Sequence, residues 1–115
     1  MDEYFFFNGR PREAELYQTL KRALAEALGE FDVLVQKTQI TFRTSKVFGC
    51  VSLRTKGCIV LSFGLPSRVA SERIWQAVEP YPNRWTHHVR IRDEAEIDDE
   101  LLGWMQAAYA FASQK

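Results

Sequence analysis

The chain has 115 residues, the usual size of a single domain with its own core, so we expect one domain over residues 1–115. Hydrophobic residues make up 46% and charged residues 26%, and no apolar run approaches the ~20 residues that span a bilayer. This excludes a membrane-spanning protein and predicts a soluble one without membrane contact. The aromatic run at residues 4–7 follows two acids and is too short for an export signal, so we expect a cytoplasmic location.

Charge is distributed unevenly along the chain, although the formal net charge is zero. The two terminal segments, residues 1–32 and 93–115, together hold 5 Lys/Arg against 13 Asp/Glu, whereas residues 33–92 hold 10 against 2. This pattern predicts acidic terminal helices and a basic central sheet, and a basic sheet face would attract an anionic partner. The alternative is that the two sets of charges only offset each other on a solvated surface.

The first helix is predicted from Pro11 to Leu28. Pro11 suits the first helical turn, and Gly29 suits the position after the last turn. Between them, apolar residues recur at three- and four-residue spacing and form one stripe: Tyr17, Leu20, Leu24, Ala27 and Leu28. Residues 1–8 are expected to form an arm that lays Phe5, Phe6 and Phe7 against the body, because that much exposed aromatic surface is unusual on a monomer.

Three runs rich in β-branched and aromatic residues predict an antiparallel meander in the centre of the chain. Short polar breaks at residues 44–45 and 56–57 separate them. The runs are Lys37–Arg43, Val47–Arg54 and Cys58–Phe63. Phe31–Val35 brings the chain into this sheet as a short strand.

The register of the first hairpin stays open, because a slip of one residue moves every side chain to the other face. A two-residue turn places Ile40 and Phe42 on one face with Val47, Val51, Leu53 and Val60. A three-residue turn places them with Phe48, Cys50, Leu61 and Phe63. In both registers Gln39, Thr41 and Arg43 lie on the opposite face, which is then the candidate for solvent or ligand.

The segment after Phe63 contains a mixture of signals. Residues 64–66 (Gly-Leu-Pro) end the strand, and residues 71–74 are expected to form a short helical turn. Residues 75–78 fit a helix or an edge strand equally well. Pro80, Pro82 and Asn83 predict a loop.

The closing strand and helix have clearer patterns. Arg84–Arg92 alternates with period two: Trp85, His87, Val89 and Ile91 face the core, and Thr86, His88, Arg90 and Arg92 face away. The last helix is predicted over residues 98–112, with Asp98 as its cap. Together the elements predict an α+β fold: an antiparallel meander of three to five strands with N- and C-terminal helices packed on one face.

The sequence offers little support for catalysis or for a bound cofactor. His87 and His88 are adjacent in a strand and point to opposite faces, so they cannot easily share a metal ion. Cys50 and Cys58 fit reduced packing residues better than a zinc site. Glycine-rich phosphate loops, nucleophile elbows and zinc-protease motifs do not occur in the sequence. We therefore predict no catalytic residue, no metal and no cofactor. An acid–base pair of Lys37 and His87 would require a common pocket.

The leading functional hypothesis is a binding module without enzymatic activity, whose basic sheet face takes an anionic ligand, a nucleic acid or an acidic protein. The candidate ligand-binding residues are cations and polar groups of the sheet and of the loop before the last strand: Lys37, Gln39, Arg43, Arg68, Arg84, His88, Arg90 and Arg92. The alternative is a protein-docking domain that associates with itself, as in a homodimer, or with another protein through exposed aromatic residues such as Phe5–Phe7, Phe48 or Trp75.

With these residues in view, the whole chain resembles the bacterial family catalogued as domain of unknown function 5655. Residues 84–89 (RWTHHV), 98–104 (DDELLGW) and 108–109 (AY) look like the closing strand and helix of that family. Residues 37–43 (KTQITFR), Phe48 and residues 63–66 (FGLP) look like its central sheet. The resemblance implies a small α+β domain, found alone or appended to larger bacterial proteins, and it brings no catalytic residues.

Overall fold

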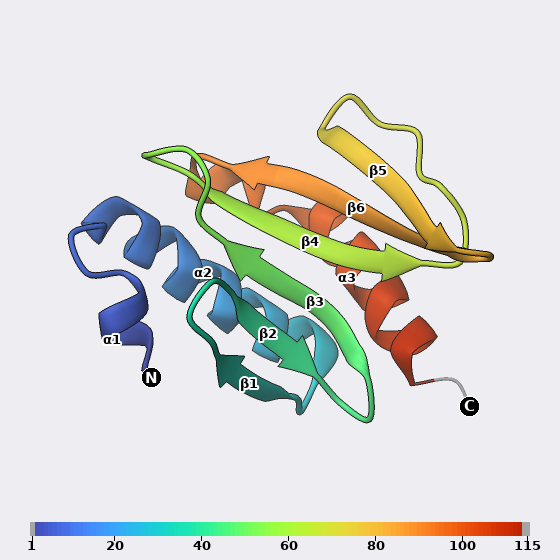
Figure 1. The fold of residues 1–115 in the computed structure, drawn as a ribbon, viewed down its shortest axis with the longest axis horizontal. Helices are drawn as coiled ribbons and strands as arrows, with labels where there is room; N and C mark the ends of the chain where they lie inside the picture. Colours follow the sequence, from blue (N-terminus) through green and yellow to red (C-terminus); the bar gives the residue numbers. More distant parts are fainter. Residues whose placement is uncertain (1, 114–115) are drawn as a thin grey trace.

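The computed structural model describes residues 2–113 and shows a six-stranded antiparallel sheet with two long helices behind it (Figure 1). The helices are α1 (Glu3–Phe6), α2 (Pro11–Leu28) and α3 (Asp99–Ala112), and a short 3-10 helix, η1 (Glu94–Glu96), precedes α3. The strands are β1 (Asp32–Val35), β2 (Ile40–Arg43), β3 (Val47–Ser52), β4 (Ile59–Leu65), β5 (Ile74–Tyr81) and β6 (Arg84–Ile91). The predicted α+β class is confirmed, but the sheet has more strands than the three to five predicted.

Helix α2 has the predicted limits, and its apolar stripe faces the sheet. Tyr17, Leu20 and Leu24 are fully buried, and the Tyr17 ring stacks on Phe42 of β2 at 6.4 Å between ring centroids. The residues before it form the short helix α1 rather than an arm. Phe7 is buried and Phe6 is half-buried, but Phe5 is 69% exposed, so the expectation that all three rings cover the body is wrong for Phe5.

One edge strand, β5, accounts for the difference in strand number, because the strand at the other edge, β1, lies within the predicted segment Phe31–Val35. The sheet order is β1-β2-β3-β4-β6-β5, so β1 and β5 lie at opposite edges. The segment expected to be a helical turn is a turn at residues 72–73, and Pro80 belongs to β5 rather than to a loop. An edge strand accepts proline because its outer N–H groups have no partner strand. A two-residue turn, Pro82-Asn83, then joins β5 to β6, with Asn83 at φ 63°.

The first hairpin follows neither predicted register, because its strands contain a bulge. Ile40 pairs with Val51 and Phe42 with Gly49, but Arg43 pairs with Val47, which leaves Phe48 as the extra residue. Phe48 therefore lies on the same side as Phe42, with their rings stacked at 6.2 Å between centroids. It is fully buried and cannot serve the exposed aromatic surface expected for protein docking.

Helix α3 completes the layer on one side of the sheet. Asp98 is its cap, as predicted, and accepts a hydrogen bond from the Leu101 amide at 3.1 Å. Met105 packs over Gly49 so closely that a Cβ at that glycine would lie 3.0 Å from the methionine methyl group. Figure 1 shows α2 and α3 behind the same face of the sheet, and among residues 2–113 no helix covers the other face. Within residues 2–113, no helix is long and apolar enough to cross a membrane.

Candidate functional site

A row of polar side chains crosses the sheet on the face away from the helices, called the open face below. Thr41 of β2 pairs with Cys50 of β3, Cys50 with Ser62 of β4, and Ser62 with His88 of β6. Gln76 of β5 pairs with His88 at the end of the row. Because paired residues of neighbouring strands project to the same side, these five side chains share one face. This set is called the polar row.

The polar row is held together by hydrogen bonds. Ser62 Oγ lies 2.7 Å from His88 Nδ1, and Cys50 is the cross-strand neighbour of Ser62 on β3. At the other end, Thr41 Oγ1 donates to Gln36 Oε1 at 2.8 Å. Burial, together with the charge of Arg54, lowers the pKa of His88, so its imidazole is neutral at pH 7. Burial also raises the pKa of the Cys50 thiol, which keeps it protonated.

An aromatic ring and two guanidinium groups gather over the His88 end of the row. Trp75 lies at an irregularity of β5, and its ring centroid is 5.6 Å from that of His88. The Arg90 guanidinium lies over the Trp75 ring at 4.7 Å, and the Arg54 guanidinium lies over it at 5.9 Å. Trp75, Arg54 and Arg90 are called the Trp75 cluster. Stacking on an indole fixes the positions of both guanidinium groups.

The arginines of the Trp75 cluster differ from the arginines on the helix side in their partners. Arg12 binds Glu94 with two hydrogen bonds of 2.9 and 2.8 Å, and Arg73 binds both Asp98 and Glu100 at 2.9 Å. No carboxylate of the described residues lies within 4.0 Å of Arg54 or Arg90. Both guanidinium groups therefore keep donors for a ligand.

A small cavity adjoins the Trp75 cluster. It has a volume of about 170 Å³ and is lined by Trp75, Arg90 and Arg92 together with Glu72, Arg73 and Glu96. It is too small for a drug-sized molecule, for which pockets of roughly 300–1,000 Å³ are usual. One anionic group is the most that it could enclose.

The predicted site residues fall into two groups. His88, Arg90 and Arg92 come together at the open face, as the period-two pattern of their strand predicts, and Gln39 lies at the far end of the polar row, 3.3 Å from Thr41. Lys37 is exposed in the turn between β1 and β2. The other predicted residues lie elsewhere: Arg43 at the end of β2, Arg68 in the loop after β4, and Arg84 over the Phe111 ring.

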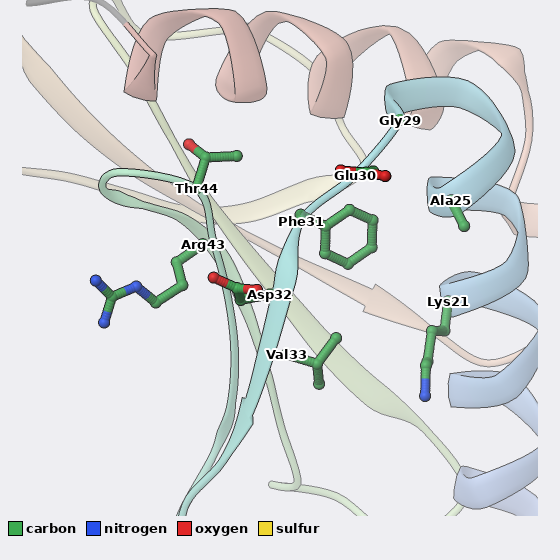
Figure 2. A pocket seen from close by; sticks show the side chains of 9 residues that line it. All are labelled: Lys21, Ala25, Gly29, Glu30, Phe31, Asp32, Val33, Arg43 and Thr44. Atoms are coloured by element: carbon green, nitrogen blue, oxygen red, sulfur yellow. The ribbon is translucent and has the colours of Figure 1, made fainter.

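Figure 2 shows a larger cavity, of about 810 Å³, at the β1 edge of the molecule. The Phe31 ring lies in its centre, with Lys21 on the helix side and Arg43 on the strand side. The two cationic groups point away from each other, and Lys21 already binds Glu3 at 3.0 Å. The cavity therefore does not bring cations together around one ligand group.

His87 occupies a different environment from its neighbour. It is fully buried on the helix side, where its ring stacks on Phe63 at 5.2 Å between centroids. Its strand, β6, is separated from the β1–β2 turn that carries Lys37 by β3 and β4. The two residues share no pocket, so the structure excludes the acid–base pair. Within the part of the chain that is described, no group of three His, Cys, Asp or Glu side chains could hold a metal ion.

Sequence reasoning missed Arg54, Trp75, Cys50 and Ser62 as parts of one site. Ser62 is the polar residue in the otherwise apolar run of β4. Its position could have indicated which side chains of this strand face away from the core. Arg54 and Trp75 carried no such signal, because only the pairing of β4 with β6 and of β6 with β5 brings them together.

Comparison with known proteins identifies one family. The family model described as "Domain of unknown function (DUF5655)" matches residues 4–112, nearly the whole chain. Neither the comparison with curated proteins nor the comparison with solved structures gave a match.

Proposed function

This chain belongs to the family of the domain of unknown function DUF5655, and we propose that it is a binding module for a phosphate-bearing ligand, held on the open face of its sheet. The single observation that carries this proposal is the Trp75 cluster. The Arg54 and Arg90 guanidinium groups both lie against one indole ring, and within the described residues neither has a carboxylate partner.

The chemistry of the cluster favours phosphate over other groups. A guanidinium group presents several N–H donors in a planar fork, which matches the oxygen atoms of a phosphate or carboxylate. Two such groups against one ring suit an anion with three or four oxygens, and Arg92 lines the small cavity with Arg90, where Glu72 and Glu96 also lie. The charge balance of residues 33–92, with 10 Lys/Arg against 2 Asp/Glu, adds a field that attracts such a ligand.

The neighbouring hydroxyl and thiol support binding rather than catalysis. Ser62 is only 6% exposed, and its hydroxyl is engaged with His88. Burial raises the pKa of Cys50, so its thiol is a poor nucleophile at pH 7. We therefore assign these residues to the floor of the site, and we propose no reaction.

The test is a titration of the 15N-labelled protein with two probes, inorganic tripolyphosphate and a single-stranded thymidylate hexamer. We expect the indole N–H signal of Trp75 to shift with both probes if the phosphate group alone is recognised, or with the hexamer only if nucleic acid is the ligand. The signals of the other two tryptophans should move less. Affinity should fall steeply between 50 and 200 mM salt, because each contacted phosphate releases counterions (~0.7 power of salt per contact for single strands).

Paired variants decide whether the cluster is the binding site. R54A/R90A should lose about 100-fold or more in affinity, because each charge-assisted hydrogen bond contributes roughly 1.5–3 kcal/mol. R22A removes an exposed arginine of α2, which has no ion pair within the described residues, and should change affinity little. Absence of binding by both probes at low salt would reject the proposal, and binding of an acidic protein alone would replace it.

A second candidate function has support at the other end of the molecule. Tyr4 is 82% and Phe5 69% exposed on α1, next to a cavity of about 550 Å³. Exposed aromatic side chains of this kind suit a protein-docking or self-associating surface. Sedimentation velocity over a hundredfold concentration range tests self-association: a shift toward dimer that Y4S/F5S removes would support it, and a strict monomer would reject the homodimer.

A further inference from the structure

His88 joins the polar row to the Trp75 cluster. Its Nδ1 atom lies 2.7 Å from Ser62 Oγ, and its ring lies beside that of Trp75. The charged or titratable groups around it are Arg54 from the segment after β3, Arg90 two residues further along β6, Cys50 two strands away and His87 on the opposite face. Gln76, the residue opposite on β5, is uncharged.

The polar row can accept a proton at His88 without losing its hydrogen bonds. In the Nε2–H tautomer of neutral His88, the Ser62 hydroxyl donates to Nδ1, which lies 2.7 Å away. When His88 is protonated, Nδ1–H donates to Ser62 Oγ instead. The serine hydroxyl is then free to rotate toward the sulfur of Cys50, its cross-strand neighbour on β3. Protonation of His88 therefore exchanges the donor and the acceptor in the Ser62–His88 hydrogen bond but does not break the bond.

We propose that ligand binding at the open face and protonation of His88 are coupled, so that the phosphate ligand binds together with one proton and more tightly as the pH falls from 7.5 to 5.5. This inference rests on the proposed function. In the free protein, Arg54 and burial oppose a charge on the imidazole, which lowers the pKa of His88. An anion bound by Arg54 and Arg90 supplies the opposite charge beside the same ring, and so favours the imidazolium form.

Coupling of this kind is reciprocal. If protonation of His88 strengthens ligand binding by a given factor, ligand binding strengthens protonation by the same factor. A tenfold gain in affinity therefore corresponds to a rise of one unit in the pKa of His88. The two quantities can be measured independently on the same protein, and they must agree.

The experiment follows the imidazole Cε1–H signal of His88 by NMR between pH 5 and 8, in the free protein and with a saturating thymidylate hexamer or tripolyphosphate. We expect the pKa of His88 to rise when the probe is present. In parallel, the affinity of the wild-type protein should increase about 3- to 10-fold more than that of H88N over this range. Because both proteins meet the same probe, titration of the probe itself cancels in the comparison.

The possible outcomes test the coupling and the proposed function separately. Binding of the probe with an unchanged pKa of His88, or with equal pH dependence in wild type and H88N, overturns the coupling and leaves the proposed function standing. No binding at any pH overturns both. S62A provides a second variant that keeps the imidazole: it should still bind the probe, but with a smaller rise in the pKa of His88, because the imidazolium loses its acceptor.

Discussion

Arg73 and Arg90 show how the same side chain has different uses on the two sides of this molecule. Both guanidinium groups lie over a tryptophan ring, Arg73 over Trp104 at 5.5 Å and Arg90 over Trp75 at 4.7 Å. Arg73 also binds two carboxylates and donates to the Glu96 carbonyl at 2.6 Å. Arg90 has the indole but no carboxylate partner within residues 2–113.

The difference follows from where the acids are placed in the sequence. The segment 93–100 contains six acidic residues next to the start of α3. Arg12 forms an ion pair with Glu94, and Arg73 forms one with Asp98, so both arginines are bound to this segment. The strands that form the open face have almost none. An arginine without a carboxylate partner contributes little to stability through ion pairs, and its donors are available to a group outside the domain.

The largest change in affinity is expected from a variant that adds a carboxylate to the open face. Q76E places a carboxylate opposite His88, within reach of the Trp75 cluster. We expect it to pair with Arg54 or Arg90 and to reduce affinity for tripolyphosphate or the thymidylate hexamer by about 100-fold, through lost donors and added repulsion, equivalent to ~2.7 kcal/mol. Isothermal titration calorimetry in low salt measures the change.

A matched variant separates the local effect of Q76E from net charge. Q106E makes the same charge change on α3, on the helix side, and should alter affinity by less than about threefold because water and salt screen distant charges. Equal losses in the two variants would mean that the whole field of the protein attracts the ligand, and that the Trp75 cluster has no special part in it.

The next variant removes Arg73, the arginine on the helix side that is compared with Arg90. R73A should lower the free energy of unfolding by about 1–2 kcal/mol, because it ends partly exposed ion pairs worth ~1 kcal/mol or less each and a stacking contact of ~0.5–1 kcal/mol. R73A should change affinity for the probes less than R90A does, because the Arg73 donors beside the small cavity are already bound to Asp98, Glu100 and Glu96. Urea unfolding of R73A and R90A provides the contrast: a loss of stability in R90A as large as that in R73A would contradict the division between the two sides.

Much of the fold was predictable where one local pattern decides it. Helix α2 has the limits expected of it, and β6 ends at Ile91, one residue earlier than expected; Tyr17 and Val89 are buried as predicted. The first hairpin was not predictable, because the bulge at Phe48 depends on packing against Phe42 rather than on turn length. Strand β5 was left undecided between a helix and an edge strand at residues 75–78, and Pro80 argues against a strand until its position at an edge is known.

The residues of the candidate site also differ in whether the sequence alone could predict their positions. The positions of His88 and Arg90 on the open face follow from the period of one strand, so sequence alone could give them. Trp75 joins them through the β5–β6 hairpin, which could not be placed while residues 75–78 stayed undecided. Arg54 joins them only through the pairing of β3 with β4 and of β4 with β6, which are distant in sequence. Arg68 and Arg84 were expected at the site because of their charge, which says nothing about the direction of a side chain.

A smaller effect, on the free energy of unfolding, is expected from a change at Glu13, a buried acid on the helix side. Its carboxylate accepts from the Gly57 amide at 3.2 Å and from Arg10 at 3.1 Å, and so ties α2 to the β3–β4 turn. Burial opposes its charge, but these donors outweigh burial and lower the pKa of Glu13. E13Q should cost about 1 kcal/mol at pH 7, since it keeps an acceptor but loses the charge.

The pH dependence of that cost checks its cause. A carboxyl group with a lowered pKa in the folded state stabilises the protein above its ordinary value of about 4.5, and this contribution is lost as the pH falls through the folded value. Urea unfolding should therefore show wild type and E13Q converging toward pH 3. A constant difference between them down to pH 3 would assign the loss to packing instead.

The smallest effect concerns the two adjacent histidines. The Val69 amide donates to Nε2 of His87 at 3.0 Å, so that nitrogen must be unprotonated, and burial lowers the pKa of the ring. A histidine with a lowered pKa costs stability when it is protonated: its contribution is complete above the ordinary value of about 6.5 and declines as the pH falls below it. For one group the decline cannot exceed ~1.4 kcal/mol per pH unit.

Because the pKa of His88 is lowered as well, the effect of His87 is best isolated in the H88N background. H88N should lose stability between pH 7 and 5.5, and H87F/H88N should lose less over this range, since phenylalanine keeps the stack on Phe63 but has no proton to gain. A polyanion should restore part of the stability that His88 loses in acid, but none of the part that His87 loses, because only His88 lies on the face where the ligand binds. Equal rescue of both would place the ligand elsewhere on the protein.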